Sequence, residues 1–184
     1  MAEKSAESVS LWFVLVILSA LNLYGACKLS YADAVQEYTA KSVLALNLAR
    51  YSDWPPEVFL DSGGTVNLCL LGDEVVQKAF NIIEKKPVGS KTLSVININE
   101  SKQLEHCHLL YICADSVNAT QWLEESSKRH ILTIGESEDF LGQGGMVYLE
   151  MSDPKINLNV NLAATQKAGV QISSRVLKLA TIFK

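Results

Sequence analysis

The chain has 184 residues, 48% of them hydrophobic, which is enough apolar material for one domain with its own core. Its formal net charge is −4 and its pI is about 5.4. We expect no nucleic-acid partner, because such a partner requires clustered lysine and arginine that this sequence does not show.

An uncharged apolar run, Leu11–Leu23, lies near the N-terminus. The run is shorter than the roughly 20 residues that span a bilayer, and it is typical of a secretory signal peptide. Small residues at Ala32 and Ala34 predict cleavage after Ala34. The sequence therefore predicts export, with a signal peptide over residues 1–34 and one folded domain over residues 35–184.

Two other outcomes stay open for the N-terminal segment. The apolar run could remain as an uncleaved membrane anchor. Alternatively, Gly25-Ala26-Cys27 has the small residues that precede a lipidated cysteine, so that a lipid on Cys27 would hold the protein at a membrane surface.

An exported chain meets oxidising conditions, and the mature chain keeps Cys69, Cys107 and Cys113. Along one extended strand, Cys107 and Cys113 would lie about 20 Å apart. Cys69 can therefore reach only one of them, since a disulfide requires Cα atoms within about 7 Å. Cys113 lies inside an apolar run and is expected to be a buried small hydrophobe, so Cys107 is the favoured partner of Cys69.

The first half of the mature chain alternates helices and strands. Apolar residues spaced near 3.6 predict a helix over Val35–Asp53, which Pro55-Pro56 ends by Trp54. The elements expected next are a strand Val66–Leu71, a helix Glu74–Lys86, a strand Thr92–Ile98 and a strand Leu109–Ala114. The last strand is almost entirely apolar, so we expect it in the centre of a sheet that is covered on both faces.

The second half continues this alternation. It predicts a helix Asn118–Arg129, a strand Ile131–Ile134, an acidic turn Glu138–Leu141, a hairpin over Gly144–Asn161 and a final helix that is capped by Ser173 or Ser174 and reaches Phe183. The expected fold class is α/β: a single three-layer domain with a mixed, mostly parallel sheet flanked by helices, and an antiparallel hairpin near the C-terminus.

Three asparagines, Asn157, Asn159 and Asn161, alternate with apolar residues in the second strand of the hairpin. Asparagine is poor in strands and costly to bury without a partner. We expect these amides on the exposed face of an edge strand, where they blunt unwanted pairing or meet a protein partner.

The sequence offers weak signals for catalysis or metal binding. His106-Cys107-His108 could ligate a metal, but a strand would point the cysteine away from both histidines, and no paired CxxC or HExxH spacing is present. No Gly-x-Ser-x-Gly elbow is present either. We expect a protein that acts by binding, without a cofactor, a metal or enzyme activity.

The order of several segments resembles the YfiR-like periplasmic proteins from about Tyr38 to the C-terminus. The segments that carry the resemblance are Asn47–Pro55, Leu68–Gly72, Cys107–Ile112, Leu132–Gly135, Phe140 with Gly144–Val147, and Asn161-Leu162 through Ile172–Ala180.

The resemblance implies an exported regulator. Such a protein would bind the periplasmic sensor region of an inner-membrane diguanylate cyclase and repress it, lowering cyclic-di-GMP and attachment. The family's disulfide would fall on Cys69 and Cys107. Some members carry a second cysteine pair before the hairpin, and this chain has none there.

Five residues near the ends of expected elements are candidates for contact with a partner or ligand: Arg50, Trp54, Asn161, Ser173 and Arg175. An alternative function, a periplasmic domain that senses a small molecule, is motivated by four of them: Arg50, Trp54, Asn161 and Arg175. A homodimer is possible under either function.

Overall fold

The structure is a computed structural model that describes residues 31–60, 63–114, 116, 118–152 and 155–183. The chain divides into two units, residues 1–37 and residues 38–184. In the first unit the described residues, 31–37, are helical. The expected apolar run and Cys27 lie outside the described residues, so signal-peptide cleavage and lipidation stay predictions. No helix among the described residues is long and apolar enough to cross a membrane.

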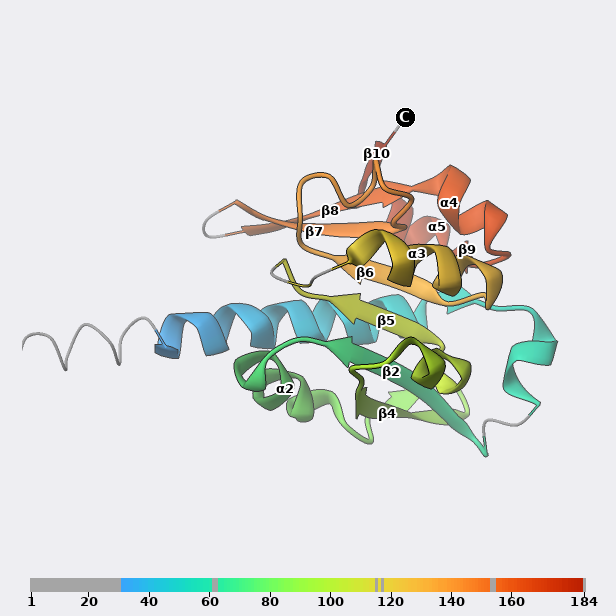
Figure 1. The fold of residues 1–184 in the computed structure, drawn as a ribbon, viewed down its shortest axis with the longest axis horizontal. Coiled ribbons are helices and arrows are strands. Elements are labelled where there is room, and N and C mark those ends of the chain that lie inside the picture. The colour runs from blue at the N-terminus through green and yellow to red at the C-terminus, as the bar shows by residue number, and fades with distance from the viewer. Residues whose placement is uncertain (1–30, 61–62, 115, 117, 153–154, 184) are drawn as a thin grey trace, which may run out of the picture. The chain divides into compact units, whose positions relative to one another are not determined.

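The second unit is built on a mixed sheet that has eight strands within the described residues (Figure 1). Their order is β10-β8-β7-β6-β5-β2-β4-β3. The strands are β2 (Thr65–Leu71), β3 (Pro87–Val88), β4 (Lys91–Asn97), β5 (Leu109–Ile112), β6 (Leu132–Gly135), β7 (Val147–Ser152), β8 (Lys155–Asn161) and β10 (Thr181–Phe183). Only the pairs β3–β4 and β7–β8 are antiparallel, so the sheet is mostly parallel and the predicted C-terminal hairpin is confirmed.

The helices are mostly short. The first runs over residues 38–50 and is called helix 38–50 below. The others are α2 (Glu74–Phe80), α3 (Ala119–Lys128), α4 (Leu162–Lys167) and α5 (Ser174–Leu177), with 3₁₀ turns η1 (Pro56–Phe59), η2 (Asn81–Ile83) and η3 (Ser101–His106). A separate pair of two-residue strands, β1 (Ser52–Asp53) and β9 (Gln171–Ile172), joins the end of helix 38–50 to the segment before α5.

Alternation along the central strands gives the sheet two apolar faces. In β2, Leu68 belongs to one buried cluster and the next residue, Cys69, to the other. In β5, Leu109 and Leu110 divide in the same way. Because successive side chains of a strand point to opposite faces, a continuous apolar run such as β5 must be covered on both sides.

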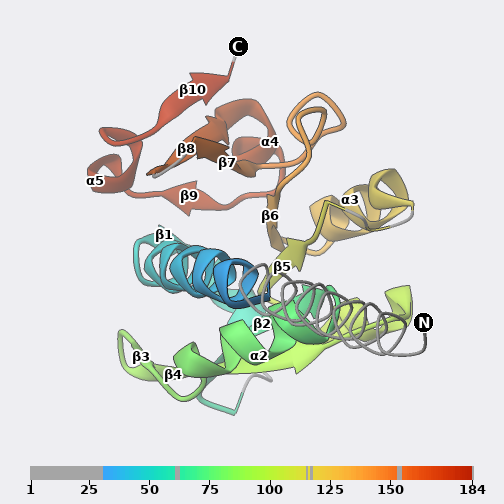
Figure 2. The same cartoon turned by 90° about the vertical axis from the view of Figure 1, so that its left-hand side faces the viewer.

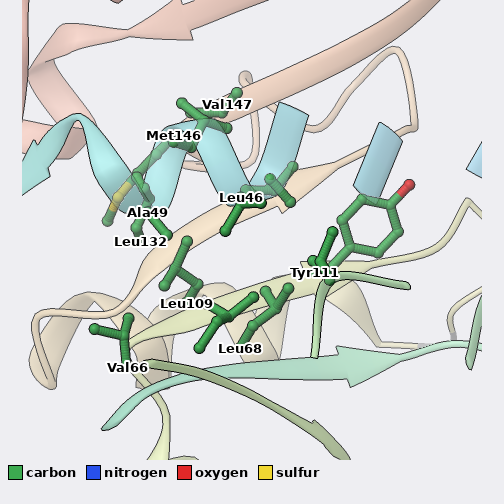
Figure 3. Close-up of a cluster of buried hydrophobic side chains, with 14 of the residues drawn as sticks. Leu46, Ala49, Val66, Leu68, Leu109, Tyr111, Leu132, Met146 and Val147 are labelled. Atoms are coloured by element: carbon green, nitrogen blue, oxygen red, sulfur yellow. The ribbon is translucent and has the colours of Figure 1, made fainter. Parts of the chain in front are cut away.

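Helix 38–50 and α2 cover the first face. Leu46 and Ala49 of the helix pack on β2, β5, β6 and β7 in the larger cluster (Figure 3). Leu68 and Leu109 are fully buried in that cluster, and removing a side chain of this size from water contributes roughly 1.5–3 kcal/mol.

The second face is covered by η3 and α3. Leu104, Trp122 and Leu123 from these elements pack on β2 and β5. Helix 38–50 and α3 therefore lie on opposite sides of β5 and β6, as Figure 2 shows. The three-layer α/β fold that the sequence predicts is confirmed.

The prediction of a final helix that reaches Phe183 is wrong beyond the first turn of that helix. Ser173 does cap α5, since its hydroxyl accepts a hydrogen bond from the backbone N–H of Arg175 at 3.3 Å. The helix ends at Leu177, however, and Thr181–Phe183 form β10, parallel to β8. Branched and aromatic residues favour strands, and β8 offers them an open row of backbone groups.

The edge position predicted for the hairpin strand β8 is also wrong. β8 pairs with β7 on one side and with β10 on the other. Its amides bond across the sheet instead: the amides of Asn157 and Asn159 donate to Glu150 of β7, at 3.3 and 3.5 Å. The short strand β10 therefore covers the edge of β8, and the asparagines do not have that role.

Candidate functional site

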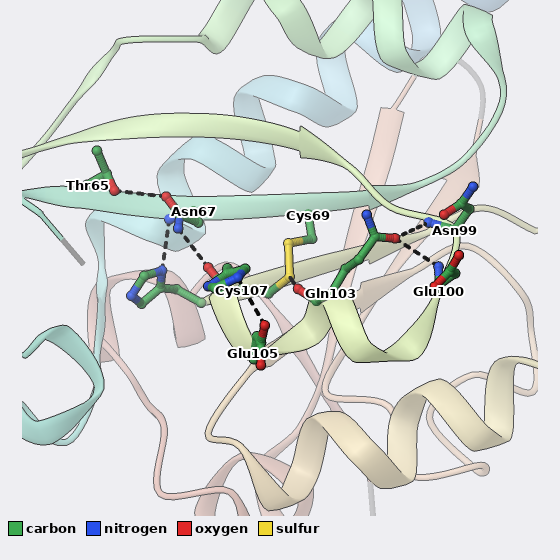
Figure 4. Close-up of a disulfide and its surroundings, with 10 residues drawn as sticks. Thr65, Asn67, Cys69, Asn99, Glu100, Gln103, Glu105 and Cys107 are labelled. Carbon is green, nitrogen blue, oxygen red and sulfur yellow. Dashed lines mark hydrogen bonds and ion pairs between the residues drawn. A yellow bond between two sulfur atoms is a disulfide. The ribbon is translucent and has the colours of Figure 1, made fainter. Parts of the chain in front are cut away.

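The disulfide joins Cys69 in the middle of β2 to Cys107 at the end of η3 (Figure 4). Their Cα atoms are 5.7 Å apart, and the residues are separated by 38 positions. Both are buried. The bond therefore ties η3 to the second face of the sheet. Cys107 is the partner that strand length and burial favoured, and Cys113 keeps a free thiol.

Gln103 closes the other end of η3. Its side-chain oxygen accepts hydrogen bonds from the backbone N–H groups of Asn99 and Glu100, each at 2.9 Å (Figure 4). Glu100 completes a capping box by accepting from the backbone of Gln103. The turn that carries Cys107 is thus fixed at both ends.

His108 holds the segment before β2 against the sheet. Its Nδ1 accepts a hydrogen bond from the backbone N–H of Asn67 at 2.9 Å, and its ring stacks on Phe59 with centroids 4.8 Å apart. Burial lowers the pKa of His108, partly offset by a hydrogen bond to the backbone of Val58. This histidine is neutral and structural.

The metal site considered for His106-Cys107-His108 does not form. Cys107 is in the disulfide, His108 is bonded to the backbone, and exposed His106 pairs with Glu105 at 3.1 Å. Among the described residues, no group of three or more histidine, cysteine, aspartate and glutamate side chains could hold a metal ion.

The five candidate contact residues are not brought together. The Arg50 side chain donates to the carbonyl of Pro87 at 2.9 Å. Trp54 packs edge-on against Phe59, with its buried indole N–H lacking a partner among the described residues. Both residues contact neighbouring segments of this chain at the end of helix 38–50.

Asn161 and Ser173 both act as helix caps. The side-chain oxygen of Asn161 accepts from the backbone N–H of Ala164 at 3.0 Å, and its amide donates to the carbonyl of Leu141 at 3.2 Å. Ser173 caps α5. Arg175 is exposed and lines a groove between several elements.

The groove is formed where the C-terminal segment meets helix 38–50. Antiparallel pairing of Ser52 with Ile172 brings α5 beside the end of that helix, and the N–H of Ser173 donates to the carbonyl of Tyr51 at 2.8 Å. The groove has a volume of about 480 Å³. We call it the apolar groove; its lining residues are Leu44, Asn47, Leu48, Tyr51, Ile156, Asn157, Leu158, Arg175, Val176, Leu179 and Thr181.

Two features make the apolar groove a candidate interface. Leu179 is 84% exposed and Tyr51 is 41% exposed, so large apolar surface faces outward. Arg175 carries the only charge among the described lining residues. The groove therefore suits a segment with apolar side chains and a neighbouring carboxylate. No local sequence pattern indicates the groove, because its residues come from four separate elements.

These features define a class. It is an α/β fold of three layers, with a disulfide between η3 and the sheet and an apolar groove beside the C-terminal strand β10. The chain matches the YfiR/HmsC-like family over residues 38–181, more than half of its length. The chain belongs to the YfiR/HmsC-like family.

Two solved structures are similar to part of this chain. A conserved domain protein from Vibrio cholerae is 13% identical, with a TM-score of 0.49 and coverage of 70% of this chain and 57% of that one. The ABC domain of a Streptococcus pneumoniae protein in complex with L-Trp is 10% identical, with a TM-score of 0.46 and coverage of 65% and 55%. This chain thus spans little more than half of either. No curated protein matches it.

Proposed function

We propose that the protein is an exported periplasmic regulator that binds the periplasmic sensor region of an inner-membrane diguanylate cyclase and represses it. The observation that carries this proposal is the apolar groove. A groove with exposed Leu179 and Tyr51 and a single cation at Arg175 suits a protein segment. Membership of the YfiR/HmsC-like family supports a cyclase as the partner.

The disulfide supports an extracytoplasmic location. A buried bond between Cys69 and Cys107 forms and persists in oxidising compartments such as the periplasm. The cyclase region that the protein would contact faces the same compartment. Repression then follows from population shift, because the regulator binds the inactive conformation of the cyclase more tightly than the active one.

The test measures cyclic-di-GMP synthesis by the detergent-solubilised cyclase with increasing amounts of the purified mature protein. We expect the unaltered protein to inhibit. Leu179→Asp should weaken inhibition at least tenfold, because it places a carboxylate in the apolar groove, and Arg175→Glu should weaken it by reversing the one charge.

Leu60→Asp is the matched control. Leu60 is 80% exposed, close to the 84% of Leu179, and it does not line the apolar groove. The control should inhibit like the unaltered protein. Absence of inhibition by the folded, disulfide-bonded protein at saturating concentration would overturn the proposed function. If Leu60→Asp weakens inhibition as much as Leu179→Asp does, the apolar groove is not the surface that binds the cyclase.

A further inference from the structure

The order in which successive strands are added to the sheet reverses at β2. β4 lies on one side of β2, and β5, the next long strand, lies on the other. The helices that follow take opposite faces: α2 packs in the cluster that contains Phe80, and α3 in the cluster that contains Trp122. In open α/β sheets, a crevice forms beyond the carboxyl ends of the strands at such a reversal, and ligands bind there.

This chain has a pocket at that place. Its volume is about 570 Å³, within the range of small-molecule sites. Its walls include Gly72 and Asp73 after β2, Cys113 and Ser116 after β5, and Trp122 of α3. Gly72 leaves room for the close approach of the two strand ends, because a Cβ there would lie 2.8 Å from the sulfur of Cys113 and one of the two would have to shift. We call this the switch-point pocket; it is separate from the apolar groove.

The lining is rich in hydrogen-bond acceptors and has one formal charge. Asp73 is the acidic residue, and none of the described lining residues is lysine, arginine or histidine. One oxygen of Asp73 accepts from the backbone N–H of Val76 at 3.0 Å, which fixes the carboxylate at the start of α2. A carboxylate has about four acceptor positions, so this cap leaves capacity for a ligand. Asn99, Asn118 and Gln121 add amide oxygens.

The buried cation Lys41 is paired with a different carboxylate. The ammonium group of Lys41 lies 3.2 Å from Glu136, and both side chains are buried. Tyr111 also donates a hydrogen bond to Glu136. The pKa of the Cys113 thiol is raised to about 12, first by burial and then by the charges of Glu136 and Asp73. The carboxylates of Asp73 and Glu136 therefore both act on this wall of the pocket, which suits a ligand that carries a positive charge.

We propose that the switch-point pocket binds a small organic ammonium compound, whose N–H groups donate to the Asp73 carboxylate and to neighbouring amide oxygens. An ammonium group brings positive charge, which the described lining residues lack, and N–H donors for the Asp73 carboxylate. Tyr38 and Trp122 supply aromatic surface for the carbon skeleton. Such binding agrees with the alternative function predicted from the sequence, a domain that senses a small molecule, although Asp73 is not among the residues predicted for that function. The proposal does not depend on cyclase repression.

The test is calorimetric titration of the mature protein at low ionic strength with ethanolamine, putrescine and alanine. Ethylene glycol and succinate serve as uncharged and anionic controls. At least one ammonium compound should bind with a Kd below about 1 mM. Alanine is included because it adds a carboxylate, and the N-terminus of α3, which lies at the pocket wall, favours a carboxylate. Tighter binding of alanine than of ethanolamine would identify an amino acid as the ammonium compound.

Asp73→Asn is the diagnostic variant, because asparagine keeps the capping oxygen for Val76 and removes the charge. It should weaken binding at least tenfold. Glu74→Gln removes the same charge from the adjacent exposed residue, which does not line the pocket, and should leave binding unchanged. Gln121→Trp should block binding by filling the pocket from its rim.

Three results would overturn the proposal: no ammonium compound binding with a Kd below about 1 mM, succinate binding as tightly as the amines, or Asp73→Asn binding like the unaltered protein. Leu179→Asp separates the two proposals, since it should keep ammonium binding while losing repression.

Discussion

The Lys41 ammonium lies 3.2 Å from the Glu136 carboxylate, and the two side chains are only 3% and 6% exposed. Lys41 comes from helix 38–50, and Glu136 follows β6. The pair therefore connects the covering helix to the carboxyl end of the sheet. Tyr111 and Tyr38 donate hydrogen bonds to the two oxygens of the same carboxylate.

Breaking this ion pair from one side should be costly. Lys41→Met leaves a buried carboxylate without its cation, and the expected loss of unfolding free energy is about 3 kcal/mol. The double variant Lys41→Met with Glu136→Gln should lose less than the single variant, because no uncompensated charge remains. Urea denaturation of the unaltered protein, Lys41→Met, Glu136→Gln and the double variant measures these losses. A double variant that is less stable by the sum of two single losses would show that the pair is not coupled.

Removal of the disulfide should destabilise the domain without changing its fold. Cys69→Ala with Cys107→Ala releases a loop of 38 residues, for which loop entropy predicts a loss of about 4 kcal/mol. Cys113→Ala is the matched control and should cost far less, because Cys113 is not bridged. Thermal unfolding compares the variants, and peptide mapping under non-reducing conditions checks the pairing. A Cys69–Cys113 peptide would contradict the structure.

Acid should destabilise the domain through His108. The pKa of His108 is lowered in the folded state, so the unfolded chain binds a proton first as the pH falls. The stability that the neutral ring contributes is complete above about pH 6.5, the unfolded value, and is lost as the pH falls below it, by up to about 1.4 kcal/mol per pH unit. Urea denaturation between pH 7.5 and pH 5 measures this slope.

His108→Asn should flatten this pH dependence, whereas His106→Asn should not, because His106 is exposed and its hydrogen bond is to a neighbouring side chain. Identical slopes for His108→Asn and the unaltered protein would assign the acid sensitivity to other groups.

Asn161 should contribute to stability as a cap. Asn161→Ala removes the acceptor for Ala164 and the donor to Leu141, and we expect a loss of about 1–2 kcal/mol. Asn161→Asp keeps the acceptor and should recover part of that loss. Chemical denaturation gives the values. If both variants unfold like the unaltered protein but inhibit the cyclase poorly, Asn161 contacts a partner as the sequence analysis expected.

Much of the sheet follows from local sequence. The apolar runs at β2 and β5 require cover on both faces, Pro55-Pro56 must end helix 38–50, and strand length separates Cys107 from Cys113. These features depend on the chemistry of neighbouring residues. For that reason the fold class and the favoured disulfide could be predicted.

The sites could not be predicted in the same way. Thr181–Phe183 become a strand because β8 has an unpaired edge, and Asn161 is a cap because α4 begins directly after β8. The switch-point pocket exists because β4 and β5 flank β2, and the apolar groove because β9 pairs with β1.

The sequence by itself determined the α/β class, the covered strands and the favoured cysteine pair, since periodicity and chain reach act over a few residues. Only the tertiary structure decided which side of β2 each later strand takes and where α5 stops. Those choices depend on pairing between segments far apart in the chain. Asp73 and Leu179 therefore gain their proposed roles from neighbours that no local pattern specifies.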